Sequence, residues 1–285
     1  MRAIVYFTIT AIFWGLNFHL AKFMLNEVRF AEAGFWRYFF GVVPLFILAY
    51  KELPSLKTIQ ENLKGIFLVG VIGLFGFNFF FFLGLLNSPA INGALIVSTT
   101  PALTILFSTL ILKTPFEKKH LLGVSISIIG VLYLILKGNI ESLMQIEFST
   151  SDILLFLSSS FFALQNVWVK KYAGNMSNKN FTFLTNLLCM LSFLFLLPFF
   201  GMENVMNYSS SFWLSAIGIG VFGTTVAYLL WNTGIKLTSA NQAGIFINVV
   251  SLSTAIFSII LGEQLYSYHL ISGLLIVIGV FVMQK

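Results

Sequence analysis

Polar side chains that could bind a solute interrupt a very apolar sequence. The stretch FWGLNFHLAK, residues 13–22, begins apolar and then carries Asn17, His19 and Lys22. A side-chain amide donates and accepts hydrogen bonds, and an imidazole exchanges a proton near neutral pH. These residue types favour solute binding. His19 is open to two interpretations, a proton-coupling group or a histidine at the membrane–water interface.

The motifs of the common catalytic and cofactor sites are absent from the sequence. There is no HExxH, no GxSxG and no nucleotide-binding loop, and the single cysteine, Cys189, lacks a partner. GIGVFG, residues 218–223, matches G-x-G-x-x-G only by letter, because it lies inside an apolar run and has no preceding strand. We therefore predict no enzyme activity, no cofactor and no metal. A membrane enzyme would need Glu203, Glu263 and His269 gathered around one wet pocket.

The composition indicates a membrane protein. Of 285 residues, 58% are hydrophobic and only 9% are charged, whereas soluble domains carry about 25% charged residues. The net charge of +6 comes from residues spread singly along the chain, so we expect no nucleic-acid partner. The partners expected are the lipid bilayer and a small-molecule solute.

Apolar runs recur from end to end of the chain. Each is about 17 to 23 residues long, enough to cross a hydrocarbon core of about 30 Å as an α-helix. The fold class predicted is therefore an all-α integral membrane protein with ten transmembrane helices. The expected spans are 3–21, 31–50, 64–86, 90–112, 120–136, 152–172, 181–200, 212–231, 240–261 and 268–283.

The basic residues predict the orientation of these spans. With a cytoplasmic N-terminus, twelve Lys and Arg residues face the cytoplasm and three, Lys22, Arg29 and Lys137, face outward. Such an excess follows the positive-inside rule. The outer loops instead hold acidic residues such as Glu141, Glu147 and Glu203. We expect a multi-pass protein of the inner (plasma) membrane with both termini in the cytoplasm.

The two halves of the chain resemble each other. A shift of 149 residues aligns His120 with His269 and Asn92 with Asn241, and a shift of 148 lays FWGLNFHLAK over FFALQNVWVK. With five spans per half, the second half enters the membrane from the opposite side. The sequence therefore predicts two inverted five-helix repeats, with a substrate site between them at mid-bilayer.

The first and sixth spans carry the main candidate binding residues. Trp14, Asn17 and Phe18 share one helical face, and the matching face of the second half carries Phe162, Gln165 and Trp168. An amide with aromatic rings from both halves suits a small zwitterionic or aromatic solute. Alternatively, the two amides only bridge helices. At comparable depth we add Asn78, Thr99, Tyr228 and Asn248.

Four further residues of the spans carry expectations of their own. Arg37, near the interior of the second span, could contact an anion, pair with an acid of another span or snorkel to the outer interface. Glu263 is expected to be a solvated residue at the end of the ninth span, and Lys22 to reach the outer headgroups. Pro101 predicts a bend in the fourth span, stabilised by the hydroxyls of the preceding STT.

These motifs together resemble a known family. FWGLN-x4-K in the first span, Arg37, STTPALT and the LGE-x9-G-x5-G tail are similar to the EamA family of the drug/metabolite transporter superfamily. The resemblance implies two EamA-like repeats, 1–142 and 147–285. The first half departs from the family pattern at Leu112-Lys113-Thr114, where similar proteins often place an acid.

The resemblance implies a secondary transporter that exports amino acids or similar small metabolites by alternating access, with proton or ion coupling, as a monomer or homodimer. The alternative is an uptake carrier for a cationic or nucleotide-derived metabolite held in an aromatic cage, which predicts that Trp14, Trp168, Tyr228 or Trp231 face one cavity. A non-transporting assembly subunit would have no cavity between the halves.

Overall fold

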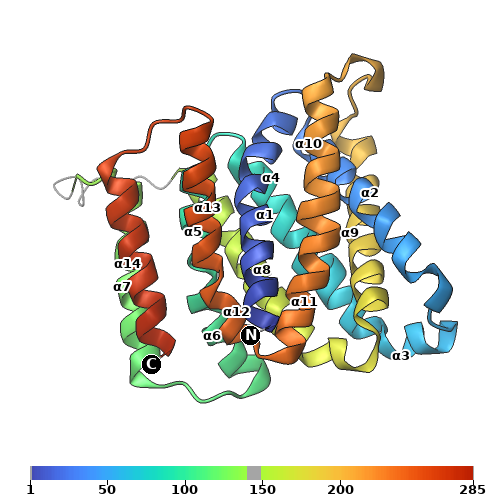
Figure 1. Cartoon of the computed structure of the whole chain (residues 1–285), viewed down its shortest axis with the longest axis horizontal. Coiled ribbons are helices and arrows are strands. Elements are labelled where there is room, and N and C mark those ends of the chain that lie inside the picture. The colour runs from blue at the N-terminus through green and yellow to red at the C-terminus, as the bar shows by residue number, and fades with distance from the viewer. Residues whose placement is uncertain (1, 140–148, 285) are drawn as a thin grey trace.

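The protein is a bundle of helices joined by short loops (Figure 1). The computed structural model describes residues 2–139 and 149–284. The helices of the first half are α1 (Arg2–Leu25), α2 (Phe30–Ala49), α3 (Leu56–Phe67), α4 (Gly76–Leu85), α5 (Ala90–Val97), α6 (Thr100–Leu112) and α7 (Lys118–Ile135). Those of the second half are α8 (Thr150–Tyr172), α9 (Asn178–Phe200), α10 (Ser210–Gly220), α11 (Ala227–Leu237), α12 (Ala240–Ile245), α13 (Ile247–Ile260) and α14 (Ser267–Gln284).

The ten predicted spans all correspond to helices. Within the described ranges, nine helical runs are long and apolar enough to cross a membrane, and α14 supplies a shorter apolar stretch, Ser267–Gly279. Both chain termini lie at the same end of the bundle (Figure 1). The protein is therefore an all-helical, multi-pass membrane protein.

The third span is longer than its hydropathy predicts. Its helical run begins at Leu56, eight residues before the expected start at 64, and continues through α4. Ser55 begins the helix by accepting a hydrogen bond from the Thr58 amide at 3.2 Å. The first two turns are polar and exposed on one side, so a search for apolar runs does not detect them.

The fourth span is interrupted, as the proline predicts. Helix α5 ends at Val97 and α6 begins at Thr100, which places Pro101 in the first turn, where its missing amide hydrogen costs little. Ser98, Thr99 and Thr100 each donate a hydroxyl hydrogen bond to a carbonyl three or four residues earlier, at 2.6–3.0 Å. The expected role of these hydroxyls is confirmed.

Local features of the first half recur in the second. The ninth span is interrupted at Phe246, 149 residues after Val97, and π-helical segments interrupt both the third span (Leu68–Phe75) and the eighth (Val221–Val226). The aligned histidines also match: His120 Nδ1 accepts from Glu117 N at 2.9 Å, and His269 Nδ1 accepts from Tyr266 N at 3.0 Å.

Two aligned lysines bind helix ends instead of reaching the headgroups. Lys22 Nζ donates to the Leu85 and Leu86 carbonyls at the end of α4, at 2.9 and 3.2 Å. Lys170 Nζ donates to the Ile235 and Thr238 carbonyls at the end of α11. The expected snorkelling was wrong for Lys22, because the free carbonyls of a helix C-terminus lie within reach and attract a cation.

The halves meet through corresponding helices. Helix α2 packs on α9, α7 packs on α14, α1 packs on α11 and α13, and α8 packs on α4 and α6. The pair α7 and α14 stands at one side of the bundle (Figure 1). The first and sixth spans therefore lie at the centre, where each contacts helices of both halves.

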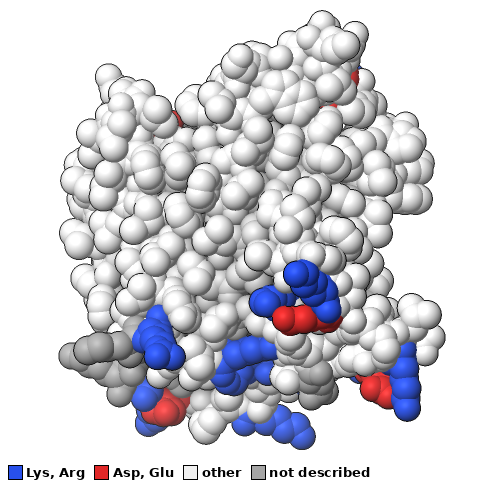
Figure 2. All heavy atoms as spheres, turned by 45° about the vertical axis from the view of Figure 1, so that its right-hand side comes forward, with Lys and Arg blue, Asp and Glu red and all other residues white. Residues whose placement is uncertain are grey.

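The basic residues visible in Figure 2 gather at one end of the molecule. On the face drawn in Figure 2, the lysines and arginines lie at the lower end, the end that also holds both termini. At the other end, Arg29 contacts Glu203, with 3.6 Å between Nε and Oε1. The acidic residues Glu141 and Glu147 lie outside the described residues.

Glycines allow the close approach of α10 to α2. A Cβ on Gly220 would lie 2.5 Å from Phe40 Cβ and 2.9 Å from the Arg37 carbonyl oxygen. We predict that Gly220→Ala destabilises the protein by about 1–3 kcal/mol, since backbone must shift to admit the methyl group. Thermal unfolding in detergent measures the effect. Gly174→Ala is the control, because nothing lies within 4 Å of its Cβ position. Equal unfolding midpoints for the two variants would contradict the packing assigned to Gly220.

Candidate functional site

A small cavity lies between the halves at the centre of the bundle. Its volume is about 30 Å³, close to the space of one water molecule in the liquid. The first, second, third and fourth spans line it from one half, and the sixth and ninth spans from the other. The lining residues are Trp14, Asn17, Phe18, Arg37, Phe77, Phe81, Val97, Phe162, Ile247 and Val250.

The candidate amides Asn17 and Gln165 occupy corresponding positions. Asn17 packs against Gly223 in the π-helical segment of the eighth span, where a Cβ would collide with the Asn17 amide. Gln165 packs against Gly73 in the π-helical segment of the third span, where a Cβ would lie 2.8 Å from Gln165 Cβ. Each amide therefore fits against a glycine of the opposite half.

These amides keep unused hydrogen-bonding capacity. Gln165 is fully buried, and neither its Oε1 nor its Nε2 has a partner among the described residues. The same is true of Asn17 Nδ2, and Asn17 lines the cavity. A buried amide without a partner costs about 1–3 kcal/mol. These three atoms form no hydrogen bond to another helix among the described residues. The structure therefore gives no support to the interpretation that the two amides only bridge helices.

Arg37 also lines the cavity. It is 2% exposed, and its Nε donates to Thr224 Oγ1 at 3.2 Å. Within the described part of the chain, no carboxylate lies within 4.0 Å of its guanidinium. The interpretation of Arg37 as a snorkelling residue was wrong, because the side chain is buried. The structure also gives no salt bridge to support pairing of Arg37 with an acid of another span.

Aromatic rings form one wall of the site. Trp14 lies 5.3 Å from Phe162, 5.4 Å from Tyr228 and 4.7 Å from Trp231, measured between ring centroids. The Trp14 Nε1 donates to the Gly223 carbonyl at 2.9 Å, which fixes its indole ring. Rings at these distances are in direct contact. The cluster therefore forms a packed wall.

The remaining candidates lie outside the central cavity. Asn78 donates to Tyr38 Oη at 2.6 Å and to its own helix at Leu74 O, and Tyr228 is buried beside Trp14. Trp168 is partly buried against the core. The structure thus brings Trp14, Asn17 and Phe18 to the cavity but leaves these three around its periphery.

Thr99 and Asn248 instead border two lateral grooves. The groove beside Thr99, between α6, α7 and α8, has a volume of about 630 Å³, and the groove beside Asn248, between α5, α13 and α14, has about 380 Å³. Both are lined almost wholly by apolar side chains. Surfaces of this kind suit lipid acyl chains.

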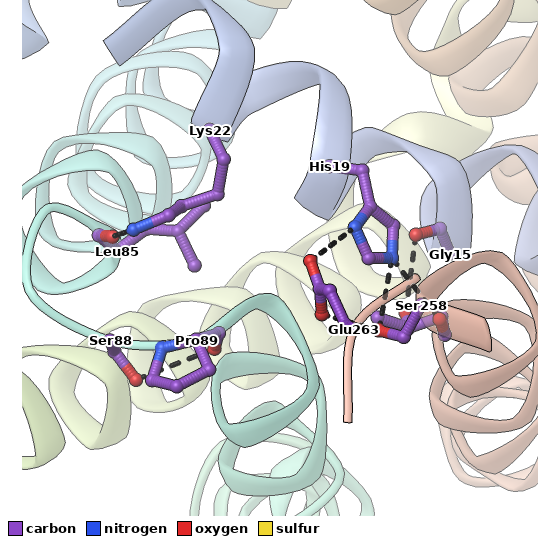
Figure 3. Close-up of polar contacts among 9 residues, drawn as sticks. Gly15, His19, Lys22, Leu85, Ser88, Pro89, Ser258 and Glu263 are labelled. Carbon is purple, nitrogen blue, oxygen red and sulfur yellow. Dashed lines mark hydrogen bonds and ion pairs between the residues drawn. The ribbon is translucent and has the colours of Figure 1, made fainter. Parts of the chain in front are cut away.

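A polar cluster joins α1 to the connection between α13 and α14 (Figure 3). His19 Nδ1 lies 3.2 Å from Glu263 Oε1, and Ser258 Oγ donates to Glu263 Oε2 at 2.7 Å. His19 Nε2 lies 3.1 Å from the Thr254 carbonyl oxygen, and His19 is 1% exposed. Glu263 is exposed at the end of the ninth span, as expected, but its carboxylate also contacts His19, which is buried in the protein.

The acidic and histidine side chains are dispersed. Glu203 contacts Arg29, Glu263 contacts His19, and His269 Nε2 lies 3.0 Å from Asn92 Oδ1. In the described ranges, no three His, Cys, Asp or Glu residues are grouped so that they could hold a metal ion. The pocket that a membrane enzyme would need is not formed by these residues.

Sequence reasoning placed Phe162 on the candidate face of the sixth span but did not identify Phe77 and Phe81 as cavity residues. The chain has 33 phenylalanines, most of which face lipid or the core, and no pattern separates these two from the others. Their common signal is position, since Phe77 and Phe81 are one helical turn apart and follow the π-helical segment Leu68–Phe75.

Comparison with known proteins agrees with the fold. The model of the EamA-like transporter family matches residues 1–136 and 149–284. A protein named uncharacterized transporter YyaM from Bacillus subtilis is 30% identical over 272 residues, which cover 95% of this chain and 89% of that protein. An uncharacterized transporter from Methanothermobacter thermautotrophicus is 24% identical, covering 95% of this chain and 83% of that protein.

One solved crystal structure shares the fold over nearly the whole length. Its TM-score is 0.72 at 17% sequence identity, and the match covers 99% of this chain and 95% of that one. The two parts of the chain that the family model matches lie on either side of the segment where the halves join. On these matches, the chain belongs to the EamA-like transporter family, within the drug/metabolite transporter superfamily.

Proposed function

We propose that this membrane transporter is a secondary carrier that exports amino acids or similar small metabolites by alternating access. The observation that carries the proposal is the central cavity, because six spans from both halves line it and it holds a buried amide with an unused donor. A site between two halves opens to one side and then the other when the halves rock against each other. The closed cavity then represents the state between the two openings.

The proposal includes two inverted repeats, 1–142 and 147–285, whose boundaries fall in a segment outside the described residues. Corresponding interruptions, π-helical segments, lysines and histidines support the repeat. An odd number of spans per repeat requires opposite orientations in the membrane. The basic end seen in Figure 2 supports an inner-membrane location with both termini in the cytoplasm. One chain encloses the cavity, so a monomer suffices as the transport unit.

Uptake of a cationic or nucleotide-derived metabolite is the weaker candidate. It requires an aromatic cage with room for an ammonium group, but Trp14, Tyr228 and Trp231 pack directly on one another. Arg37 also faces the cavity and would repel a cation.

The solute site is tested by flux measurements with purified protein in liposomes, comparing amino acids, nucleosides and quaternary amines. We expect amino acids to move fastest. Asn17→Ala and Gln165→Ala should each lower flux about tenfold or more, since loss of one hydrogen bond to a charged solute costs about 1.5–3 kcal/mol. Asn62→Ala, in α3, is the control because its amide bonds within its own helix. Unchanged flux and an unchanged solute ranking in both site variants would refute the assignment.

We further propose that proton coupling uses the pair His19 and Glu263. Both ring nitrogens of His19 face oxygen acceptors, the Glu263 carboxylate and the Thr254 carbonyl. A protonated imidazole donates to both, whereas a neutral one donates to only one. The other charged group near the pair is Lys22, one helical turn from His19. Its ammonium group interacts electrostatically with the Glu263 carboxylate. Proton release therefore weakens the contact that holds α1 to the chain after α13.

The coupling proposal predicts loss of pH control in two variants. His19→Gln and Glu263→Gln should abolish the acceleration of flux by a pH gradient while solute exchange without a gradient continues. His120→Gln is the control, since His120 bonds only at its own helix start. Flux in liposomes with an imposed gradient measures the effect. A gradient response of wild-type size in both pair variants would exclude this site as the coupling group.

A further inference from the structure

We infer that Arg37 is the anchor for the carboxylate of the transported solute, so that the site selects apolar monocarboxylates. This inference rests on the proposed transport function and narrows its substrate class. It goes beyond the sequence analysis, in which Arg37 had three alternative roles.

The guanidinium of Arg37 is buried with most of its donors unused. A guanidinium has five N–H donors, and among the described residues only Nε has a partner, Thr224 Oγ1 at 3.2 Å. The Thr224 hydroxyl donates in turn to the Ile219 carbonyl at 3.1 Å, which holds it in place. The terminal amino groups are therefore free to bind a ligand in the cavity that Arg37 lines.

Among the described residues, no carboxylate lies at ion-pair distance from the Arg37 guanidinium. The four ion pairs of the described residues involve other groups, and the nearest acid in the same helix, Glu32, binds Glu203 N and Tyr208 Oη. The guanidinium carbon lies 5.6 Å from the centre of the Tyr38 ring, an attraction of about 0.5–2 kcal/mol. The penalty for a buried, unpaired ion is several kcal/mol, which exceeds that attraction. An anion that binds from outside the protein would pair with the guanidinium and so remove the penalty that the Tyr38 contact does not offset.

The geometry points to a monoanion. Among the described residues, Arg37 is the one charged side chain that lines the cavity, and Asn17, which also lines it, has an unpartnered donor, Nδ2. A carboxylate accepts two parallel bonds from a guanidinium and a further bond from an amide. A phosphate dianion would need a second cation, which the lining residues do not supply.

The rest of the cavity suits an apolar body without an ammonium group. Phe77, Phe81 and Phe162 form its walls, and no acidic residue lines it. An ammonium group would therefore gain no ion pair there. Because a buried ammonium group would lose its hydration without gaining a partner, an acid without an amino group should bind more tightly than the amino acid, and the amide of that amino acid should bind most weakly.

The experiment compares 3-phenylpropionate, L-phenylalanine and L-phenylalaninamide as probes. Binding to the purified protein is measured by calorimetry and flux in liposomes. We expect 3-phenylpropionate to bind most tightly and L-phenylalaninamide to bind at least about tenfold more weakly than L-phenylalanine, because the amide lacks the carboxylate that pairs with Arg37.

Variants separate the Arg37 contact from general damage to the fold. Arg37→Gln should weaken both carboxylates by about 10- to 150-fold and leave the amide unchanged. Arg37→Lys should lose less, because it keeps the charge but not the paired geometry. Thr224→Val should weaken only the carboxylates, by a smaller factor, because Nε loses its acceptor. Arg29→Gln, at the exposed outer end, is the matched control.

Two results would overturn the inference: a wild-type protein that binds phenylalaninamide as tightly as phenylpropionate or binds none of the three, and a folded Arg37→Gln that keeps the wild-type preference for carboxylates. If Arg37→Gln does not fold, the inference is still tested by the binding of the three probes to the wild type and to Thr224→Val. Flux of another solute class would leave the proposed transport function standing, whereas a wild type that moves no solute would remove that function as well.

Discussion

The surrounding lipid offers no hydrogen bonds, so every polar group within the bilayer must find its partner inside the protein. This requirement explains most polar contacts of the structure. Lys22 and Lys170 bind the free carbonyls at the ends of α4 and α11, and Ser98, Thr99 and Thr100 bind the carbonyls exposed where the fourth span is interrupted. The groups with partners are thus those that hold helices together or end them.

Buried polar atoms without a partner among the described residues occur in several helices, and three of the residues concerned lie at or beside the central cavity. Asn17, Gln165 and Arg37 are all at least nine-tenths buried, and each retains donors without a partner among the described residues. Two of them line the same cavity. In hydrocarbon such groups are expensive, and a protein that keeps them has a use for them. Under the proposed transport function, a solute that enters the cavity supplies the missing partners, and its departure restores the closed form.

The sequence predicted the fold better than the site. Span number and position follow from apolar runs, and the interruption at Pro101 follows from proline chemistry, so both were predicted correctly. The polar start of α3 was missed because a hydropathy pattern does not register amphipathic turns. The contact between His19 and Glu263, 244 residues apart in the sequence, could not be predicted, since it depends on how the chain after α13 folds back. The free guanidinium of Arg37 likewise became visible only when the neighbours supplied by other spans were known.

The central claim is that the cavity opens to each side of the membrane in turn. Its most direct test is the labelling of Phe81→Cys by a membrane-impermeant thiol reagent, applied from either side of sealed vesicles, in a background in which Cys189 is replaced by Ser. Phe81 lines the cavity and is 2% exposed in the closed form. The account predicts that the introduced thiol reacts with reagent from both sides and that bound solute slows the reaction. A thiol that remains unreactive from both sides, with and without solute, would contradict it.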